Sequence, residues 1–249
     1  MNTIEKNLYD FYRIFGSVKN VRLITGNGYE LVGSDNESWP QMIFNLDQST
    51  DPLKLVPLIV TEIEKRQPAP FFIAPEGYIS RNHTELLKTN AIVPVKILKG
   101  MSCIPERKEN VTLPPECEIY ELIDDEQLTD FAHLIGKEFI AAELSYIKVL
   151  LNGIKSAGEV QMTGLFYNKT LVSSALVLTK AGMAGLYFIV TRREFQNKGY
   201  ASTLIRFILN RMYKAGVKEV VLHANNFSAG LYQKLGFEYQ NNFVIYKKQ

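Results

Sequence analysis

The sequence has few of the features that mark secreted, membrane-spanning or metal-binding proteins. It contains two cysteines, Cys103 and Cys117, whose separation fits neither a metal knuckle nor a redox pair. The first residues, "MNTIEKNLYDFYRIF", carry acidic side chains inside their apolar pattern and hold no uninterrupted apolar stretch of the kind that forms a secretory signal or a bilayer span. These absences predict reduced, incidental thiols, no metal and a cytoplasmic location.

An excess of charge of one sign is also missing. The chain has 28 basic and 26 acidic side chains, a net charge of +2. Because this balance produces no strong field, we expect neither a nucleic-acid partner nor a membrane. Apolar residues make up 46% and charged residues 22%, as in ordinary globular proteins. The 249 residues are enough for one large domain or two ordinary ones.

A stretch rich in proline and charge marks the best domain boundary. In "IPERKENVTLPPECE" the prolines remove main-chain donors, and charges replace the apolar periodicity. The prediction is therefore a smaller N-terminal α/β domain (1–104), a linker (105–117) and a C-terminal domain (118–249).

The C-terminal part predicts a mixed α/β sheet with helices on its faces. One strand is followed by two helices, the first with Asp124 and Gln127 as a capping box, and then by three antiparallel strands. Next comes a helix that ends at Gly216, a buried strand, and a short helix stopped by Gly236. Two last strands are expected to join at Asn241–Asn242.

The N-terminal part repeats this order faintly. The expected elements are strands in "NVRLIT", "YELVG" and "PQMIFNL", a helix around Val56–Ile63, a strand in "PFFIA", a helix in "TELLKTN" and a strand in "VPVKILKGM". Two interpretations are open: a degenerate internal repeat, or the resemblance that any two α/β domains show. The segment "NLDQSTDPLK" has no glycine where an anion-binding turn would lie, so a repeat would have lost its cofactor site.

The segment "FQNKGYAST", residues 195–203, lies between a predicted strand and a predicted helix. The first main-chain NH groups of a helix have no partner within the helix, and the helix dipole adds partial positive charge there. Small residues at Gly199 and Ala201 allow an anion to approach these NH groups closely. The segment therefore predicts an anion-binding helix start.

Together, "VTRREFQNKGYAST" and "NNFSAGLYQKLGFEY" resemble the GNAT superfamily of acyl-CoA-dependent acyltransferases, over roughly residues 118–249. Gln196, Gly199 and Ala201 match the family's Arg/Gln-x-x-Gly-x-Gly/Ala loop, whose NH groups hold the pyrophosphate of coenzyme A. The resemblance implies the GNAT fold in the C-terminal domain and acetyl-CoA as co-substrate. The cofactor-binding residues that it implies are Ile189, Val190, Thr191, Gln196, Asn197, Lys198, Gly199, Tyr200, Ala201, Ser202 and Asn225.

Some of these residues have a plain structural alternative. Lys198 is either a phosphate ligand or a solvated surface charge, and Asn225 either orients the cofactor or forms a turn. By resemblance, Tyr232 protonates the departing thiolate; otherwise it is a core aromatic. Glu143 is our candidate for the general base, with Glu138, Glu159, His133 and His223 as alternatives.

The function that follows is transfer of an acetyl or other short acyl group from acyl-CoA to a primary amine. Small amines, amino acids, antibiotics and protein termini are all open as acceptors, and the oligomeric state is open too. One alternative is an aminoacyl-tRNA-dependent transferase of tandem GNAT type, which the near-neutral charge disfavours. Another is a non-catalytic module that binds acyl-CoA as a sensor.

Overall fold

The computed structural model describes residues 2–34, 39–47, 49, 51–106, 111–140 and 142–249. The chain divides into two compact units: unit 1 comprises Met1–Gly100 and Gln240–Gln249, and unit 2 comprises Met101–Tyr239. This division differs from the predicted one, which placed residues 240–249 in the C-terminal domain and the boundary at 105–117. Residues 107–110 of the predicted linker lie outside the described residues.

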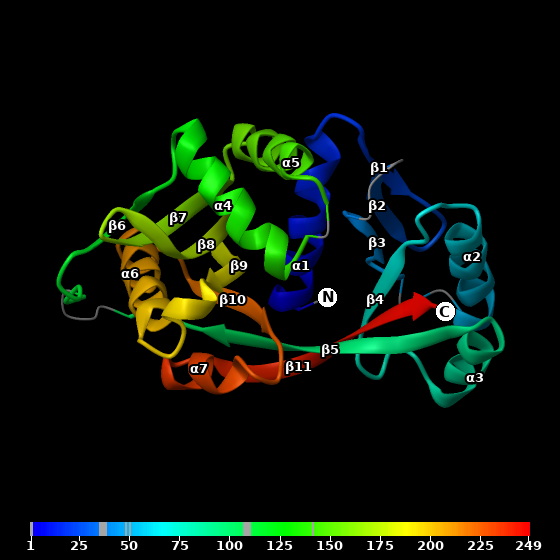
Figure 1. The fold of residues 1–249 in the computed structure, drawn as a ribbon. Coiled ribbons are helices and arrows are strands. Elements are labelled where there is room, and N and C mark those ends of the chain that lie inside the picture. The colour runs from blue at the N-terminus through cyan, green and yellow to red at the C-terminus, as the bar shows by residue number, and fades with distance from the viewer. Residues whose placement is uncertain (1, 35–38, 48, 50, 107–110, 141) are drawn as a thin grey trace. The chain divides into compact units, whose positions relative to one another are not determined.

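Unit 1 is an α/β unit with a mixed sheet (Figure 1). Its elements are α1 (Thr3–Arg13), η1 (Ile14–Ser17), β1 (Val21–Thr25), β2 (Glu30–Ser34), β3 (Gln41–Phe44), α2 (Pro52–Glu64), β4 (Phe71–Pro75), α3 (Arg81–Thr89), most of β5 (Ile92–Cys103) and most of β11 (Glu238–Lys248). The strand order is β1-β2-β3-β4-β11-β5. The β1–β2, β2–β3 and β4–β11 pairs are antiparallel, whereas β3 and β4 are parallel.

Unit 2 has the same architecture with longer strands. Its elements are β6 (Cys117–Glu121), α4 (Asp125–Glu138), α5 (Leu144–Ser156), β7 (Val160–Tyr167), β8 (Thr170–Lys180), β9 (Met183–Thr191), η2 (Arg193–Phe195), α6 (Tyr200–Lys214), β10 (Glu219–Ala224) and α7 (Ala229–Lys234), together with the ends of β5 and β11. The order is β6-β7-β8-β9-β10-β5. The β6–β7, β7–β8 and β8–β9 pairs are antiparallel, whereas β9 and β10 are parallel and are connected by α6.

The helix ends follow the local sequence signals. The Asp124 carboxylate accepts a hydrogen bond from the Gln127 NH at 2.8 Å, and the Gln127 side chain accepts one from the Asp124 NH at 3.4 Å, which confirms the capping box of α4. Gly216 has a φ of 71°, and the Val217 NH donates to the Met212 carbonyl at 3.0 Å. This left-handed stop ends α6 as predicted.

The core of unit 2 explains why α6 packs on the sheet. Its apolar residues recur every three or four positions and lie on one face of the helix, where they join residues of β8, β9 and β10 in one buried cluster. The members from α6 are Tyr200, Leu204, Ile205, Ile208, Leu209 and Met212. In Figure 1, α6 covers one face of β7, β8 and β9, and α4 and α5 cover the other.

The two units repeat one order of elements: three antiparallel strands, a helix, a parallel strand, a helix and a last strand. In unit 1 this series runs from β1 to β5, and in unit 2 from β7 to β11. The last strand of each series is divided between the units: residues 101–103 of β5 belong to unit 2, whereas residues 240–248 of β11, which pairs with β4, belong to unit 1. The hairpin predicted at Asn241–Asn242 was wrong, since β11 runs through these residues as one strand.

Cys103 and Cys117 are free thiols in the structure. Both are buried, one at the end of β5 and the other at the start of β6, rather than in a loop. Burial raises the pKa of the Cys117 thiol. Among the helices of the described residues, none combines the length and apolar character that a membrane crossing requires.

Candidate active site

The start of α6 presents unpaired main-chain NH groups. Gly199 is its N-cap and has a φ of 86°, a conformation that L side chains rarely adopt. The first hydrogen bond at this end runs from the Thr203 NH to the Gly199 carbonyl at 3.0 Å. The NH groups of Tyr200, Ala201 and Ser202 have no partner among the described residues. An anion at this helix end would therefore meet unpaired donors and the positive end of the helix dipole.

The loop before α6 is held by local contacts. The Gln196 side-chain amide donates to the Thr191 carbonyl at 3.1 Å, which ties the loop to the end of β9. Phe195 and Tyr200 flank the loop in the sequence. Their rings and that of Tyr167 contact one another, with centroids 5.9 to 6.1 Å apart. The Lys198 ammonium lies 5.3 Å from the Phe195 ring. These contacts fix the loop before any ligand binds.

The matching helix of unit 1, α2, begins differently. Its N-cap is Asp51, whose carboxylate accepts a hydrogen bond from the Leu53 NH at 3.0 Å, and Pro52 has no NH to offer. The Asp47 carboxylate accepts from the Ser49 NH at 2.9 Å. Gln48 and Thr50 of the predicted glycine-free segment lie outside the described residues. The Asp51 carboxylate thus satisfies a main-chain NH group that an anion would otherwise meet at this helix start.

Strands β9 and β10 separate close to the start of α6. Their parallel pairing runs from Met183 and Glu219 to Leu186 and Leu222 and goes no further, although β9 continues to Thr191. Beyond Leu186 the edge of β9 that faced β10 is left without that partner. Open strand edges of this kind bind extended ligand groups through main-chain hydrogen bonds.

A bulge in β9 accompanies this separation. Ser174 is opposite Val190 and Leu176 is opposite Tyr187, so Phe188 and the residue after it face a single residue of β8. Phe188 has a φ of 48°, which is rare for a bulky residue. Bulges redirect the strand and occur often beside active sites.

Main-chain direction distinguishes the three predicted strand residues. The Val190 carbonyl accepts from the Ser173 hydroxyl at 3.1 Å and the Arg192 NH donates to Val172 at 2.9 Å, so both residues face β8. Because successive residues of a regular strand face opposite edges, Thr191 faces the edge that β10 has left, whereas Ile189 lies in the bulge, where this alternation is interrupted. The Thr191 carbonyl already accepts from Gln196.

Asn225 forms the turn that begins α7. Its side-chain oxygen accepts from the Ser228 NH at 2.8 Å, and its carbonyl accepts from the Ala229 NH at 3.1 Å. This is the turn-forming role that we set beside the cofactor role. The side-chain oxygen is used in the turn, which leaves the amide NH₂ group as the part that can reach a ligand.

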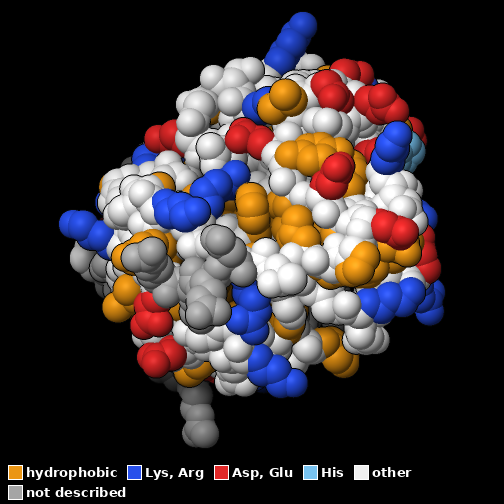
Figure 2. Space-filling view, turned by 90° about the vertical axis from the view of Figure 1, so that its left-hand side faces the viewer, with side chains coloured by type: hydrophobic (Ala, Val, Ile, Leu, Met, Phe, Trp, Pro, Cys, Tyr) orange, Lys and Arg blue, Asp and Glu red, His pale blue; other side chains and the backbone are white. Residues whose placement is uncertain are grey.

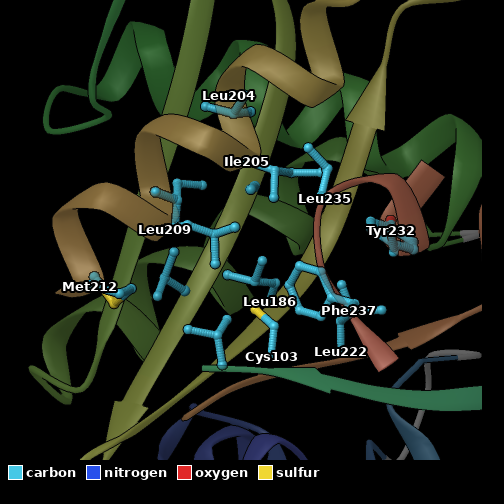
Figure 3. Packing of buried hydrophobic residues seen from close by; sticks show 14 of the residues in the cluster. Cys103, Leu186, Leu204, Ile205, Leu209, Met212, Leu222, Tyr232, Leu235 and Phe237 are labelled. Carbon is cyan, nitrogen blue, oxygen red and sulfur yellow. The ribbon is translucent and has the colours of Figure 1, made fainter. Parts of the chain in front are cut away.

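Tyr232 is a buried residue of α7 with its ring in the core. Its ring lies 5.9 Å from that of Phe237, and Figure 3 shows both in the cluster that contains Leu235. Burial raises the pKa of Tyr232 to about 12, although a hydrogen bond with the Ser228 side chain acts in the opposite direction. The phenol is therefore protonated over the whole physiological pH range.

The comparisons with known proteins agree with this geometry. The model of the acetyltransferase (GNAT) family matches residues 120–237. Residues 120–237 form a GNAT acetyltransferase domain. The loop at Gly199, the separating strands and Tyr232 all lie within it. No curated protein matches the chain.

Solved structures extend the similarity of fold to nearly the whole chain. A GCN5-related N-acetyltransferase from Kribbella flavida has a TM-score of 0.73 at 10% identity, covering 99% of this chain and 95% of its own. One from Sphaerobacter thermophilus has a TM-score of 0.66 at 14% identity, with 90% and 81% covered. A tandem GNAT protein from the clavulanic acid biosynthesis pathway has 0.62 at 12%, with 94% and 86% covered. The fold is thus that of GNAT proteins, tandem ones included.

The candidates for a general base occupy different places in the GNAT domain. Glu143 is the exposed N-cap of α5, and His133 and Glu138 are exposed on α4. Glu159 forms an ion pair with Lys180 at 3.4 Å. His223 stands apart from the other four, because both of its ring nitrogens are shielded from solvent.

His223 lies where β9 and β10 separate. It follows Leu222, the last residue of β10 in register with β9, and its ring is stacked at 6.3 Å on that of Tyr187, which lies directly after the last β9 residue of this register. Desolvation lowers the pKa of His223 to about 3. Among the described residues, no group of three or more His, Cys, Asp or Glu side chains is placed to hold a metal ion.

Sequence reasoning missed several residues of this site. Tyr167 lies at the end of β7, and no sequence signal links it to Phe195 and Tyr200. The bulge at Phe188 and the hydrogen bond from Ser173 also depend on strand register. Phe195 alone stands within the motif, where an aromatic residue directly before Gln196 was the available signal.

Proposed function

We propose that this chain transfers an acetyl or other short acyl group from acyl-CoA to a primary amine. The observation that carries the proposal is the start of α6. There the NH groups of Tyr200, Ala201 and Ser202 are unpaired, directly after the N-cap Gly199 with its φ of 86°. A diphosphate matches these donors in charge and in hydrogen-bonding type. The GNAT family model over the same residues supports acyl-CoA as its source.

The other site residues have distinct roles in this proposal. Asn197, Lys198 and Gly199 contribute to the pyrophosphate loop, with the Lys198 ammonium as a point charge. The open edge of β9 at Ile189 and Thr191 holds the extended arm, and a main-chain NH of this edge stabilises the thioester oxygen as it becomes negative. Acyl-CoA itself supplies the activated acyl group.

Tyr232 acts as a hydrogen-bond donor to the leaving sulfur. A phenol whose pKa is about 12 is a weaker acid than a thiol near ~8.5, so complete proton transfer to the thiolate costs roughly 5 kcal/mol. The phenol therefore stabilises the sulfur most while the C–S bond is breaking and charge develops on it. Its burial keeps water away from this position.

The acceptor amine must lose a proton before or during the attack. We retain Glu143 as the proposed base, because it begins α5 as an N-cap whose carboxylate makes no capping hydrogen bond. A low pKa makes His223 a poor proton acceptor by itself, although it lies closer to the separating strands.

A tandem GNAT protein that uses charged tRNA is the second candidate, and the repeated order of elements favours it. Such an enzyme needs a stripe of cations to contact phosphates along the tRNA. On the face shown in Figure 2, Lys and Arg side chains are interspersed with Asp and Glu among the described residues. The unpaired NH groups of α6 also suit one diphosphate better than an extended nucleic acid.

The test is an acyl-transfer assay with the full chain. The protein is incubated with radiolabelled acetyl-CoA and a panel of amines, amino acids and peptides, and the products are identified by mass spectrometry. We expect an N-acetylated product and release of free coenzyme A. Transfer of an aminoacyl group from charged tRNA, with no turnover of acetyl-CoA, would contradict the proposal.

A further inference from the structure

Phe227 is the most exposed of the large hydrophobic side chains in the described residues. Its relative exposure is 99%, against 75% for Ile104 and 69% for Ile123. Exposing an aromatic ring this completely forgoes the free energy that its burial would supply. A ligand that covers the ring would recover this free energy.

The turn that carries Phe227 is fixed. It connects β10 to α7, and Asn225 closes it by accepting hydrogen bonds from the NH groups of Ser228 and Ala229 at 2.8 and 3.1 Å. The ring is thus presented by a defined turn and not by a long loop. A surface presented in this way loses little conformational entropy when a ligand covers it.

Phe227 and the pyrophosphate loop lie at the same edge of the sheet in unit 2. Strands β9 and β10 are parallel, so the loop after β9 and the turn after β10 both emerge at their carboxyl ends. The helices that follow also pack together, because Tyr200 of α6 and Ala229 of α7 belong to one core cluster. Figure 3 shows Ile205 of α6 beside Leu235, which directly follows α7.

We propose that Phe227 is the stacking platform for the adenine ring of the acyl-CoA donor. This inference rests on the proposed function, since it takes acyl-CoA as the ligand of the Gly199 loop. Exposed cations at the same edge, Arg193 and Lys198, suit the phosphates, whereas an exposed aromatic face suits the flat purine. Together, the Gly199 loop and the Phe227 ring would make the enzyme select a complete nucleotide thioester over a shorter phosphopantetheine thioester.

Calorimetry with two ligands tests this assignment. The probes are acetyl-CoA and acetyl-4′-phosphopantetheine, which keeps the thioester and the arm but lacks the adenosine. We expect Phe227→Ala to weaken acetyl-CoA binding about tenfold and to leave the shorter thioester unchanged, because stacking on an aromatic ring contributes only when the base is present. Phe227→Trp should restore acetyl-CoA affinity, and Phe227→Leu should not.

Tyr239→Ala is the matched control, because Tyr239 is a half-exposed aromatic residue that belongs to β11 and not to the turn between β10 and α7. It should change neither affinity. Equal weakening of both ligands by Phe227→Ala, or no change in either, would overturn the inference. So would a change in sedimentation of Phe227→Ala, since the ring would then cover another protein surface. If the unaltered chain binds neither thioester, the proposed function itself fails.

Discussion

Tyr232 is the residue on which the proposed chemistry depends most directly. Tyr232→Phe removes the hydroxyl group and keeps the ring that packs near Phe237. We expect kcat to fall on the order of 10- to 100-fold, because a positioned donor to the leaving sulfur is lost, while acetyl-CoA affinity changes less than about twofold. Steady-state kinetics and calorimetry on the same preparation separate the two. An equal loss in both quantities would count against the donor role.

His223 makes the free energy of unfolding depend on pH. Its pKa is about 3 in the folded chain and about 6.5 when unfolded, so below pH 6.5 the unfolded chain binds a proton that the folded chain does not. Stability therefore falls as the pH drops from 6.5 toward 3, by roughly 2 kcal/mol at pH 5 from this residue.

Denaturant unfolding at pH 7.5 and pH 5 measures the effect. The loss of stability between the two pH values should be smaller in His223→Gln than in the unaltered chain by about the same 2 kcal/mol. Identical losses in both proteins would show that His223 is not kept neutral by burial.

At the residue scale, sequence predicts what local geometry dictates. Gly199 and Gly216 stand where a helix must start or stop, and both have positive φ angles in the structure. The aromatic support under the loop could not be predicted, because Tyr167 comes from a distant strand. Strand register decides which side chains meet in such contacts. A shift of one residue would turn each side chain of the strand to the other face of the sheet.

At the scale of elements, the two equivalent helices α2 and α6 differ in the way their first turns are capped. The start of α6 is open, whereas Asp51 supplies a capping carboxylate at the start of α2. We therefore expect one acetyl-CoA per chain by calorimetric titration. A stoichiometry of two would mean that unit 1 has kept a site.

Asp51→Ala separates capping from binding. It should lower the free energy of unfolding by about 1 kcal/mol, as for other lost N-caps, and leave acetyl-CoA affinity unchanged. Chemical denaturation and calorimetry provide the two readouts. If the variant instead bound a second acetyl-CoA with lower affinity, the Asp51 carboxylate alone would be what prevents anion binding at the start of α2.

Sequence periodicity predicts the elements of both units well. The three strands, helix, strand, helix and strand expected before residue 104 are all present, as β1 to β5 with α2 and α3. The last strand was misread because Asn241–Asn242 is a common turn signal. In the structure these residues lie within the β11 strand, and Asn242 donates to the Glu76 side chain at 2.7 Å, so tertiary pairing overrides the local preference.

For the whole molecule, the division of β11 between the two units has a consequence for stability. The C-terminal residues pair with β4 through Phe243, Val244, Ile245 and Tyr246. Deleting residues 240–249 should therefore destabilise unit 1, which combines these residues with the first hundred residues of the chain. Hydrogen exchange followed by mass spectrometry should show lost protection in β4. Unchanged exchange there would contradict this pairing.

The central claim is that an acyl-CoA diphosphate binds to the open start of α6. Gly199→Val tests it, and Gly216→Val is its control, since both glycines have positive φ angles and no atom near the added Cβ. Each substitution strains one end of the same helix by about 1–2 kcal/mol. In calorimetry with acetyl-CoA, our account predicts that Gly199→Val abolishes binding and Gly216→Val leaves it intact. Equal affinity in the two variants would contradict it.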